Sequence, residues 1–301
     1  MVFSSFHLTE GRIAPLYCGR FKLTFERPLV MGILNVTPDS FSDGGCFLAH
    51  DDALQKAEKM IAEGADLLDI GGESTRPGSI PIQIDVELNR VIPLLDDLKR
   101  FNIPLSIDTY KPEIMSAAID SGCDMINDIW SFRKPGAIDA VRDKNVGLCV
   151  MHMLGDPRTM QISLPVYRDI ISNVRNFLSE RIDFLRSEGI KLERICVDPG
   201  FGFGKTTIKD NYELLAALQK VAPSRPDNLS YPVLVGISRK AMLGAVISDK
   251  PPEKRIAASV SAALCAIERG AAIVRVHDVG ATVDALNIWL EVHNMMRQRN
   301  I

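Results

Sequence analysis

The sequence predicts an α/β protein whose main part is a (β/α)8 barrel, preceded by a short N-terminal hairpin. Eight short apolar segments alternate with amphipathic helical segments along most of the 301 residues, a pattern typical of a parallel sheet covered by helices. The interval from Asn35 to His277, divided among seven repeats, gives about 35 residues per unit, close to the ~30 residues of a barrel unit. An open doubly wound sheet shows the same alternation, but the count of eight units favours the closed barrel.

The predicted strands are short runs rich in Val, Ile and Leu. Most of them lack an alternation of polar and apolar residues, which indicates parallel strands that are buried on both faces. They are predicted at residues 29–35, 66–71, 104–108, 124–128, 146–152, 194–198, 232–236 and 272–277.

Helices are predicted between the strands and after the last one. Residues 51–64 carry apolar side chains at helical spacing and end at Gly64, a residue type common at helix C-termini. The same spacing predicts helices over 251–270 and 278–296, of which the second closes the chain.

The chain is expected to form one barrel domain with a small extension. Residues 1–28 contain spaced glycines and a proline among apolar residues, which predicts a hairpin outside the repeats. No interdomain linker interrupts residues 29–301, so we expect a single domain there.

Composition indicates a reduced, cytoplasmic chain. The 35 basic and 38 acidic residues give a net charge of −3, which gives no reason to expect binding to nucleic acid or to an anionic membrane. No apolar run reaches the ~18 residues of a membrane span, and the N-terminus lacks the features of a signal peptide. The six cysteines form no C-x-x-C motif, so neither a zinc site nor a disulfide framework is expected.

Polar residues gather at the predicted carboxyl ends of the strands, where barrel enzymes carry out their chemistry. Any one of them could simply cap the following helix or face solvent. A set spread over most of the strands is hard to explain in that way, and it predicts a site. The set consists of Asn35, Asp69, Asp108, Asn127, Asp198, Lys240, Arg275 and His277.

Three loops leave the same end of the predicted barrel. Residues 35–45 and 71–79 are rich in Gly, Ser and Pro, and the second loop is expected to carry Thr75 and Arg76 over the site. The third, DPGFGFGKTT at 198–207, resembles a phosphate loop but has Pro199 where Walker A requires glycine. Its glycines are expected instead to let the backbone and Phe203 approach a planar ligand closely.

The charges of these side chains predict two kinds of contact. Asp198 can offer two acceptor oxygens to adjacent N–H donors of a heterocycle. The cations Arg76, Arg275 and His277, with Lys240 nearby, predict an anionic group, because Arg matches phosphate oxygens and barrel enzymes often bind phosphate near strands seven and eight.

These motifs resemble those of the dihydropteroate synthase family, pterin-binding enzymes of folate biosynthesis. The resemblance covers nearly the whole chain from the first strand onward, in family order. The matching stretches are MGILNVTPDSFSDGG (31–45), DIGGESTRPG (69–78), SIDT (106–109), INDI (126–129), DPGFGFGK (198–205), GISRK (236–240) and RVHDV (275–279).

The resemblance implies a TIM barrel transferase that joins 6-hydroxymethyl-7,8-dihydropterin diphosphate to para-aminobenzoate. It also implies a homodimer that sulfonamides inhibit, and a Mg2+ ion that Asn35 holds together with diphosphate oxygens. Arg76, Lys240, Arg275 and His277 are implied as catalytic residues. The implied substrate-binding residues are Thr75, Asp108, Asn127, Asp198, Phe203, Ser238, Lys240, Arg275 and His277.

The chemistry of that reaction suits these residues. An aryl amine is neutral near pH 7 and needs little activation, so the difficult part is the departure of a highly charged diphosphate. Cations stabilise that charge, and the electron-rich pterin can delocalise a developing cation. We therefore expect a magnesium-assisted dissociative displacement, in which Asp198 and Asn127 orient the ring.

Two other functions compete with this interpretation. A methyl-transferring enzyme that binds a folate in a similar barrel needs no grip on diphosphate, so the cations named above count against it. A non-catalytic pterin-binding protein is expected to have lost the metal and diphosphate groups while keeping Asp198, whereas Asn35, Arg275 and His277 all remain.

Overall fold

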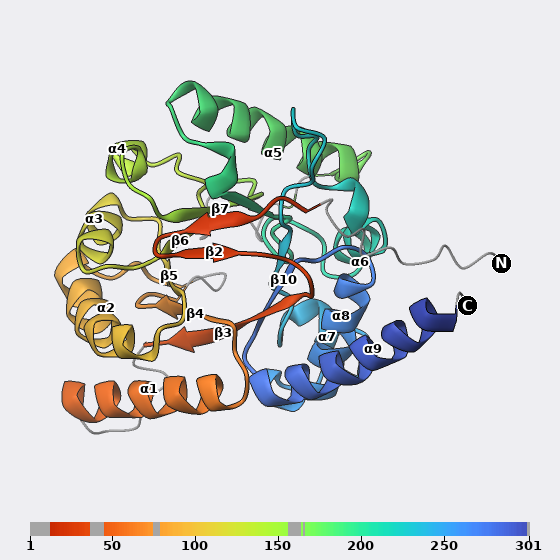
Figure 1. Ribbon diagram of the computed structural model, residues 1–301, viewed down its shortest axis with the longest axis horizontal. Coiled ribbons are helices and arrows are strands. Elements are labelled where there is room, and N and C mark those ends of the chain that lie inside the picture. Colours follow the sequence, from red (N-terminus) through yellow and green to blue (C-terminus); the bar gives the residue numbers. More distant parts are fainter. Residues whose placement is uncertain (1–12, 37–44, 75–78, 156–163, 165, 300–301) are drawn as a thin grey trace.

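The computed structural model describes residues 13–36, 45–74, 79–155, 164 and 166–299, and it confirms the barrel fold. Figure 1 shows the strands at the centre of the molecule and the helices in a ring around them. The barrel strands are β3 (Leu29–Asn35), β4 (Leu67–Gly71), β5 (Leu105–Asp108), β6 (Met125–Asp128), β7 (Gly147–Met151), β8 (Ile195–Asp198), β9 (Leu234–Val235) and β10 (Ile273–Val276).

All eight strands pair in parallel, in the order β8-β7-β6-β5-β4-β3-β10-β9. The ring closes between β8 and the residues before β9, where the Val197 amide donates to the Pro232 carbonyl over 2.9 Å. Each predicted strand contains one of these strands, so the eight predictions are confirmed. Only β9 is much shorter than predicted, because Pro232 has no N–H to donate to a ladder.

The helices fill the spaces between consecutive strands. The predicted helix at 51–64 begins earlier, at Gly45, and Gly64 follows it in the left-handed region with φ +96. The helix predicted from 251 begins at Ile256, after a 3-10 turn that contains Pro252. The helices are α1 (Gly45–Ala62), α2 (Ile84–Leu98), α3 (Pro112–Asp120), α4 (Ala137–Val141), α5 (Ile170–Ser187), α6 (Lys209–Ala216), α7 (Ala241–Gly244), α8 (Ile256–Ile267) and α9 (Val279–Arg299).

The described helices pack on the barrel through one large apolar core. Outward-facing residues of the strands, such as Val30, Leu68 and Ile107, belong to this core together with the inner faces of the helices. In the described part of the chain, no helix combines the length and the apolar character needed to cross a membrane.

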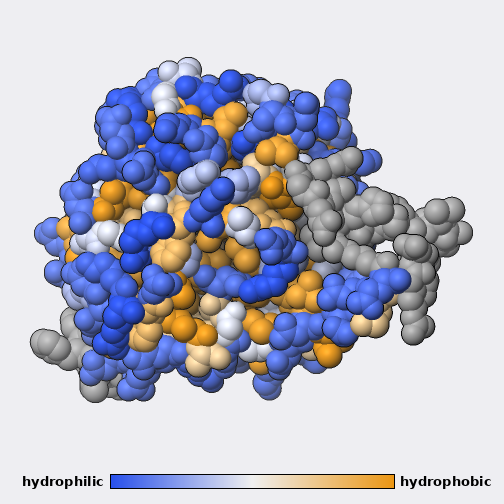
Figure 2. Space-filling model, in the orientation of Figure 1, coloured by the Kyte–Doolittle hydropathy of each residue, from blue (hydrophilic) through white to orange (hydrophobic). Residues whose placement is uncertain are grey.

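The N-terminal hairpin closes the base of the barrel. Strands β1 (Leu16–Cys18) and β2 (Phe21–Leu23) pair antiparallel and lie across the barrel in front in Figure 1. Leu16 and Cys18 are fully buried in a second apolar cluster with residues from the amino-terminal parts of the strands, including Leu67 and Met125. Figure 2 shows apolar residues gathered over the middle of this face among hydrophilic ones. The predicted site residues at the strand ends, such as Asn35, Asp108 and Asp198, lie at the opposite, carboxyl end of the barrel.

Candidate active site

The strands bring polar side chains into the barrel mouth by simple alternation. Side chains two residues apart on a strand point the same way, and in four strands an inward apolar residue of the basal cluster is followed two positions later by a polar one. The pairs are Leu67 and Asp69, Met125 and Asn127, Cys196 and Asp198, and Ile273 and Arg275. The polar layer therefore lies directly above the apolar layer that the hairpin seals.

Arg275 joins three strands at the centre of this layer. Its Nε lies 2.5 Å from Asp69 Oδ2 and its Nη2 lies 2.8 Å from Asp108 Oδ2. Asn127 Nδ2 donates to the same Asp69 oxygen over 3.0 Å. Asp69, Asp108, Asn127 and Arg275 thus form one hydrogen-bonded group, in which Asp69 has a central place that the sequence did not reveal.

Burial and charge act against each other on this group. Burial raises the pKa of Asp108 to about 7, although Arg275 opposes the rise. Burial also disfavours the charge on Arg275, but Asp69 and Asp108 more than compensate and raise its pKa above the ordinary value. Arg275 therefore keeps its positive charge, whereas the Asp108 carboxyl can gain or lose its proton near pH 7.

Two acceptor atoms in the group lack a partner. Asp69 Oδ1 and Asp108 Oδ1 are buried, and neither has a hydrogen-bond partner within the described ranges. Buried polar atoms are almost always paired, so exceptions of this kind need an explanation, for which a bound ligand or water is one. These oxygens are available to the N–H donors of a ligand bound in the mouth.

A second group lies on the β8 and β9 side of the mouth. Asp198 Oδ1 accepts from the Gly200 amide over 2.7 Å, and Lys240 Nζ donates to the Phe201 carbonyl over 2.5 Å. The same Nζ lies 4.7 Å from the centre of the Phe203 ring. Burial raises the pKa of Asp198, which Lys240 opposes, and lowers the pKa of Lys240 to about 8, which Asp198 opposes. A carboxylate, an ammonium group and an aromatic face therefore meet here.

Ser238 and His277 link the exits of β9 and β10. His277 Nδ1 lies 3.0 Å from Ser238 Oγ, which also accepts from the His277 amide over 3.2 Å. The neighbouring Arg239 pairs with Asp278 through bonds of 3.0 and 2.5 Å. These contacts hold the segments that carry Lys240 and Arg275 in a fixed relation.

Asn35 ends β3 beside the acidic group. A Cβ built on Gly71 would lie 3.5 Å from Asn35 Oδ1 and 3.7 Å from the Asp108 Cβ, so both side chains border that glycine. Among the described residues, no group of three His, Cys, Asp or Glu side chains could hold a metal ion. A single amide oxygen fits Mg2+ when substrate phosphates and water supply the remaining ligands. The donor set therefore suits a metal that binds together with a diphosphate.

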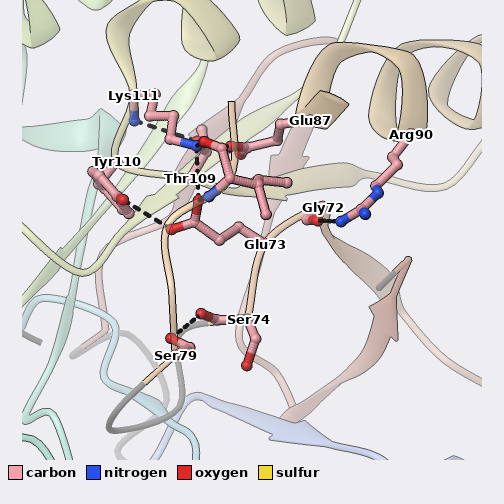
Figure 3. Close-up of polar contacts among 10 residues, drawn as sticks. Gly72, Glu73, Ser74, Ser79, Glu87, Arg90, Thr109, Tyr110 and Lys111 are labelled. Atoms are coloured by element: carbon pink, nitrogen blue, oxygen red, sulfur yellow. Dashed lines mark hydrogen bonds and ion pairs between the residues drawn. The ribbon is translucent and has the colours of Figure 1, made fainter. Parts of the chain in front are cut away.

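Thr75 and Arg76 lie outside the described residues, and Figure 3 shows the polar contacts that hold the residues on either side of them. Lys111 Nζ lies 2.7 Å from carboxylate oxygens of both Glu73 and Glu87, and it also donates to the Ile82 carbonyl over 2.7 Å. These residues fix the chain on both sides of the loop, at 73 and at 82.

An apolar wall, which the sequence did not predict, borders the mouth. Ile129, Met151 and Met153 form a buried cluster against which Tyr110, Trp130 and Phe203 pack. Met151 could have been found, because it follows the inward Cys149 by two positions on β7. Ile129 and Met153 follow strand ends, where alternation no longer applies. Phe203 connects this wall to the second polar group, because its ring lies beside Lys240 Nζ.

The fold and this site define a pterin-binding barrel enzyme, and the profile of the pterin binding enzyme family matches residues 31–277. Dihydropteroate synthase of Haemophilus influenzae is 44% identical over 280 residues, which cover 93% of this chain and 99% of that protein. The chain belongs to the dihydropteroate synthase family, transferases of folate biosynthesis. The family and the enzyme class predicted from the motifs are thereby confirmed.

Solved structures agree with this assignment. Burkholderia cenocepacia dihydropteroate synthase complexed with 7,8-dihydropteroate is 65% identical, has a TM-score of 0.89, and matches 95% of this chain and 99% of its own. The Yersinia pestis dihydropteroate synthase in a sulfonamide drug complex is 43% identical, with a TM-score of 0.85 over 93% of this chain and 99% of its own.

Proposed function

We propose that this chain joins 6-hydroxymethyl-7,8-dihydropterin diphosphate to para-aminobenzoate and releases diphosphate and 7,8-dihydropteroate. The observation that carries the proposal is the pair of unpaired carboxylate oxygens beside Arg275 and Lys240 in a buried, partly apolar mouth. Such a site offers acceptors to a flat ring with several N–H groups and cations to a leaving anion. The dihydropteroate complex of the Burkholderia enzyme supports the same ligand class.

In this proposal the carboxylates recognise the pterin. The ring lies against the wall of Ile129, Met151 and Met153 and donates hydrogen bonds to the unpaired oxygen of Asp108 and to the carboxylate of Asp198, whose Oδ1 also accepts from the Gly200 amide. Asn127 is held by Asp69 and presents its carbonyl oxygen. These contacts orient the CH2 carbon toward the incoming amine. Holding two reactants in the right geometry lowers the barrier, because the entropy of bringing them together has already been lost on binding.

The cations assist the departing diphosphate. The bond from the CH2 carbon to the diphosphate oxygen breaks first, the amine nitrogen then bonds to that carbon, and the proton that the amine loses passes to solvent water. Arg275, Lys240 and His277, with Arg76 from the neighbouring loop, stabilise the charge that builds on the leaving oxygens. A Mg2+ ion held by Asn35 and the diphosphate supplies further charge neutralisation when it is bound.

The para-aminobenzoate side of the site is proposed around Phe203, Ser238 and Lys240. Phe203 offers a ring face and Lys240 a cation for the carboxylate, and the loop at 75–77 completes this side. Sulfonamides share the aryl amine with an anionic group opposite it, so we expect them to compete with para-aminobenzoate. The sulfonamide complex of the Yersinia relative supports this expectation.

The test is a turnover assay with a diagnostic variant. The purified chain is mixed with the pterin diphosphate, para-aminobenzoate and Mg2+, and diphosphate release is followed. Folded protein without turnover would rule the proposal out, and methyl transfer from methyltetrahydrofolate would replace it with the competing enzyme class. Arg275→Ala should reduce kcat/KM for the diphosphate substrate at least tenfold more than it weakens binding of dihydropteroate, which lacks the diphosphate. Equal losses would contradict the role of Arg275.

We further propose that the chain works as a cytoplasmic homodimer. Four apolar residues at helical spacing on α9 are exposed, namely Ile288, Val292, Met295 and Met296. The adjacent α8 adds the exposed Ile256. Exposed apolar residues on one helix face are typical of a protein interface, and the described cysteines are free thiols, in keeping with a reducing compartment.

Sedimentation of the purified chain and of Val292→Glu tests the dimer. The wild type should sediment as a dimer at micromolar concentration, whereas a charge in the middle of the apolar face should yield monomers. A wild-type chain that remains monomeric at that concentration would refute the homodimer.

A further inference from the structure

Lys205 is a buried ionisable residue that the proposed reaction does not use. It is 1% exposed and follows the glycine-rich segment that begins at Asp198. Its Nζ lies 2.9 Å from His152 Nδ1, 2.7 Å from the Gly200 carbonyl and 3.1 Å from the Phe203 carbonyl. Three acceptors match the three protons of an ammonium group. A residue buried at this cost and fully hydrogen-bonded is expected to have a specific task.

His152 is the side chain that accepts a hydrogen bond from Lys205. Burial and the nearby Lys205 lower the pKa of His152 to about 2, so the ring is neutral and carries one proton. Because Nδ1 faces the ammonium group, it is the acceptor nitrogen, and Nε2 carries the proton toward Asn173 Oδ1 at 3.4 Å. A buried, neutral and sterically fixed imidazole therefore anchors Lys205 to the end of β7.

The other two bonds of Lys205 hold the segment that shapes the substrate pocket. Gly200 bonds to Asp198 through its amide and to Lys205 through its carbonyl. The Phe203 carbonyl accepts a hydrogen bond from Lys205, and the Phe203 ring lies against the ammonium group of Lys240. The segment also packs closely on β7, because a Cβ on Gly200 would lie only 1.9 Å from the His152 carbonyl oxygen. Lys205 thus holds the backbone of the 200–203 segment from the inside of the protein, while the same segment contacts Asp198 and Lys240.

We propose that Lys205, anchored by His152, is a positioning residue that fixes Asp198 and Phe203 in the geometry that binds the pterin and para-aminobenzoate. The inference rests on the proposed function, because that function assigns the pterin to Asp198 and para-aminobenzoate to Phe203. Lys205 does not touch the reacting atoms, and it acts through the backbone of Gly200 and Phe203. Burial lowers the pKa of Lys205 to about 7, and the nearby Asp198 opposes that change.

Four variants of the full-length chain test the proposal. Lys205→Met removes the donor and keeps the length of the side chain, while Lys209→Met is the matched control on an exposed lysine of α6. His152→Leu removes the acceptor, whereas His152→Asn keeps an oxygen near the position of Nδ1. Kinetic constants, dihydropteroate binding and thermal unfolding are measured for each.

Lys205→Met and His152→Leu should each weaken dihydropteroate binding at least tenfold and raise KM for both substrates, with a smaller change in kcat. His152→Asn and Lys209→Met should stay within about threefold of the wild type. This split separates positioning from a purely structural role, which would lower the unfolding temperature but leave the constants of the folded fraction unchanged.

Folded Lys205→Met with wild-type KM values and dihydropteroate binding would overturn the proposal. If Lys205→Met does not fold, the two His152 variants decide, and equal constants for them would overturn it as well. A wild-type chain that releases no diphosphate would instead refute the proposed function, so the two failures are distinguishable.

Discussion

At the scale of single residues, the barrel mouth contains ionisable side chains whose charged forms are disfavoured by burial. Burial raises the pKa of Asp108 and Asp198 and lowers the pKa of Lys240, and in each case an oppositely charged neighbour resists the change. The charged groups therefore depend on one another. Removing any one of them changes the protonation of the rest as well as its own contact with a ligand.

Asp198→Ala should cost about 2–4 kcal/mol in dihydropteroate binding or in kcat/KM, because it removes a charge-assisted acceptor from the pocket. Titration calorimetry and initial rates measure the two quantities. Asp139→Ala on α4 is the control, since the Asp139 side chain is 71% exposed and pairs with Arg142 three residues further along the chain. Unchanged constants in Asp198→Ala would contradict the pocket assignment.

Asp108→Asn should change the pH dependence of stability. The Asp108 pKa is about 7 in the folded chain, well above the ordinary 3.8. Between these values the folded state holds a proton that the unfolded state has lost, so this group makes the protein less stable as pH rises from about 4 to 7. The variant removes that loss. Its unfolding temperature, relative to the wild type, should therefore be higher at pH 8 than at pH 5. The same difference at both pH values would show that Asp108 is ionised throughout.

The polar residues of the mouth could be found from the sequence because they stand at fixed steps along buried strands. Asp69 was located in that way, but its role was not, because the bonds to Asn127 and Arg275 cross from β4 to β6 and β10. Lys205 was read as part of a failed nucleotide motif, and its partner His152 lies 53 residues away. Contacts at such separation have no local signal.

At the scale of elements, strand positions were predictable and the exact ends of helices were not. A strand exit shows as the end of an apolar run, whereas α1 begins at Gly45, within a segment whose composition indicates a loop. The network that follows β4 was also hidden. Glu73, Glu87 and Lys111 come from three segments and look individually like solvent-exposed charges.

Lys111→Met should destabilise the protein by about 3–5 kcal/mol, because it leaves two buried carboxylates without their cation. The side chains of Glu73 and Glu87 are only 7% and 1% exposed. Urea unfolding provides the measurement. Lys99→Met is the matched control, since Lys99 pairs with Asp96 on the surface of α2 and such pairs contribute at most ~1 kcal/mol. A cost as small as that of the control would show that the carboxylates protonate without penalty.

At the scale of the whole molecule, stability and chemistry occupy opposite ends of one barrel. The hairpin packs Leu16 and Cys18 into the base, and Arg20 binds Asp124 through two bonds of 3.0 and 3.1 Å. The carboxyl ends of the strands hold the polar groups. In barrels, residues at the amino-terminal face serve stability, and those at the carboxyl-terminal face serve catalysis. A change at the base should therefore alter the free energy of unfolding and leave turnover intact.

Gly19→Ala tests this separation, with Gly189→Ala as its control. Both glycines have positive φ, +57 and +87, so alanine is strained at either position. A Cβ on Gly189 meets nothing within 4 Å, whereas one on Gly19 would lie 2.7 Å from the Asp124 Cα and 2.4 Å from its Oδ1. We expect about 1 kcal/mol for Gly189→Ala from strain alone. Gly19→Ala should cost at least ~3 kcal/mol, because the hairpin must move away from Asp124 and the Arg20 ion pair is lost.

Both quantities are measured on the same preparations, unfolding by urea and kcat by diphosphate release. Folded Gly19→Ala should keep kcat within about twofold of the wild type, since the apolar layer between the hairpin and Arg275 remains in place. Equal costs for the two variants would show that the hairpin can shift without resistance. A marked fall of kcat in folded Gly19→Ala would show that the base of the barrel controls the geometry of its mouth.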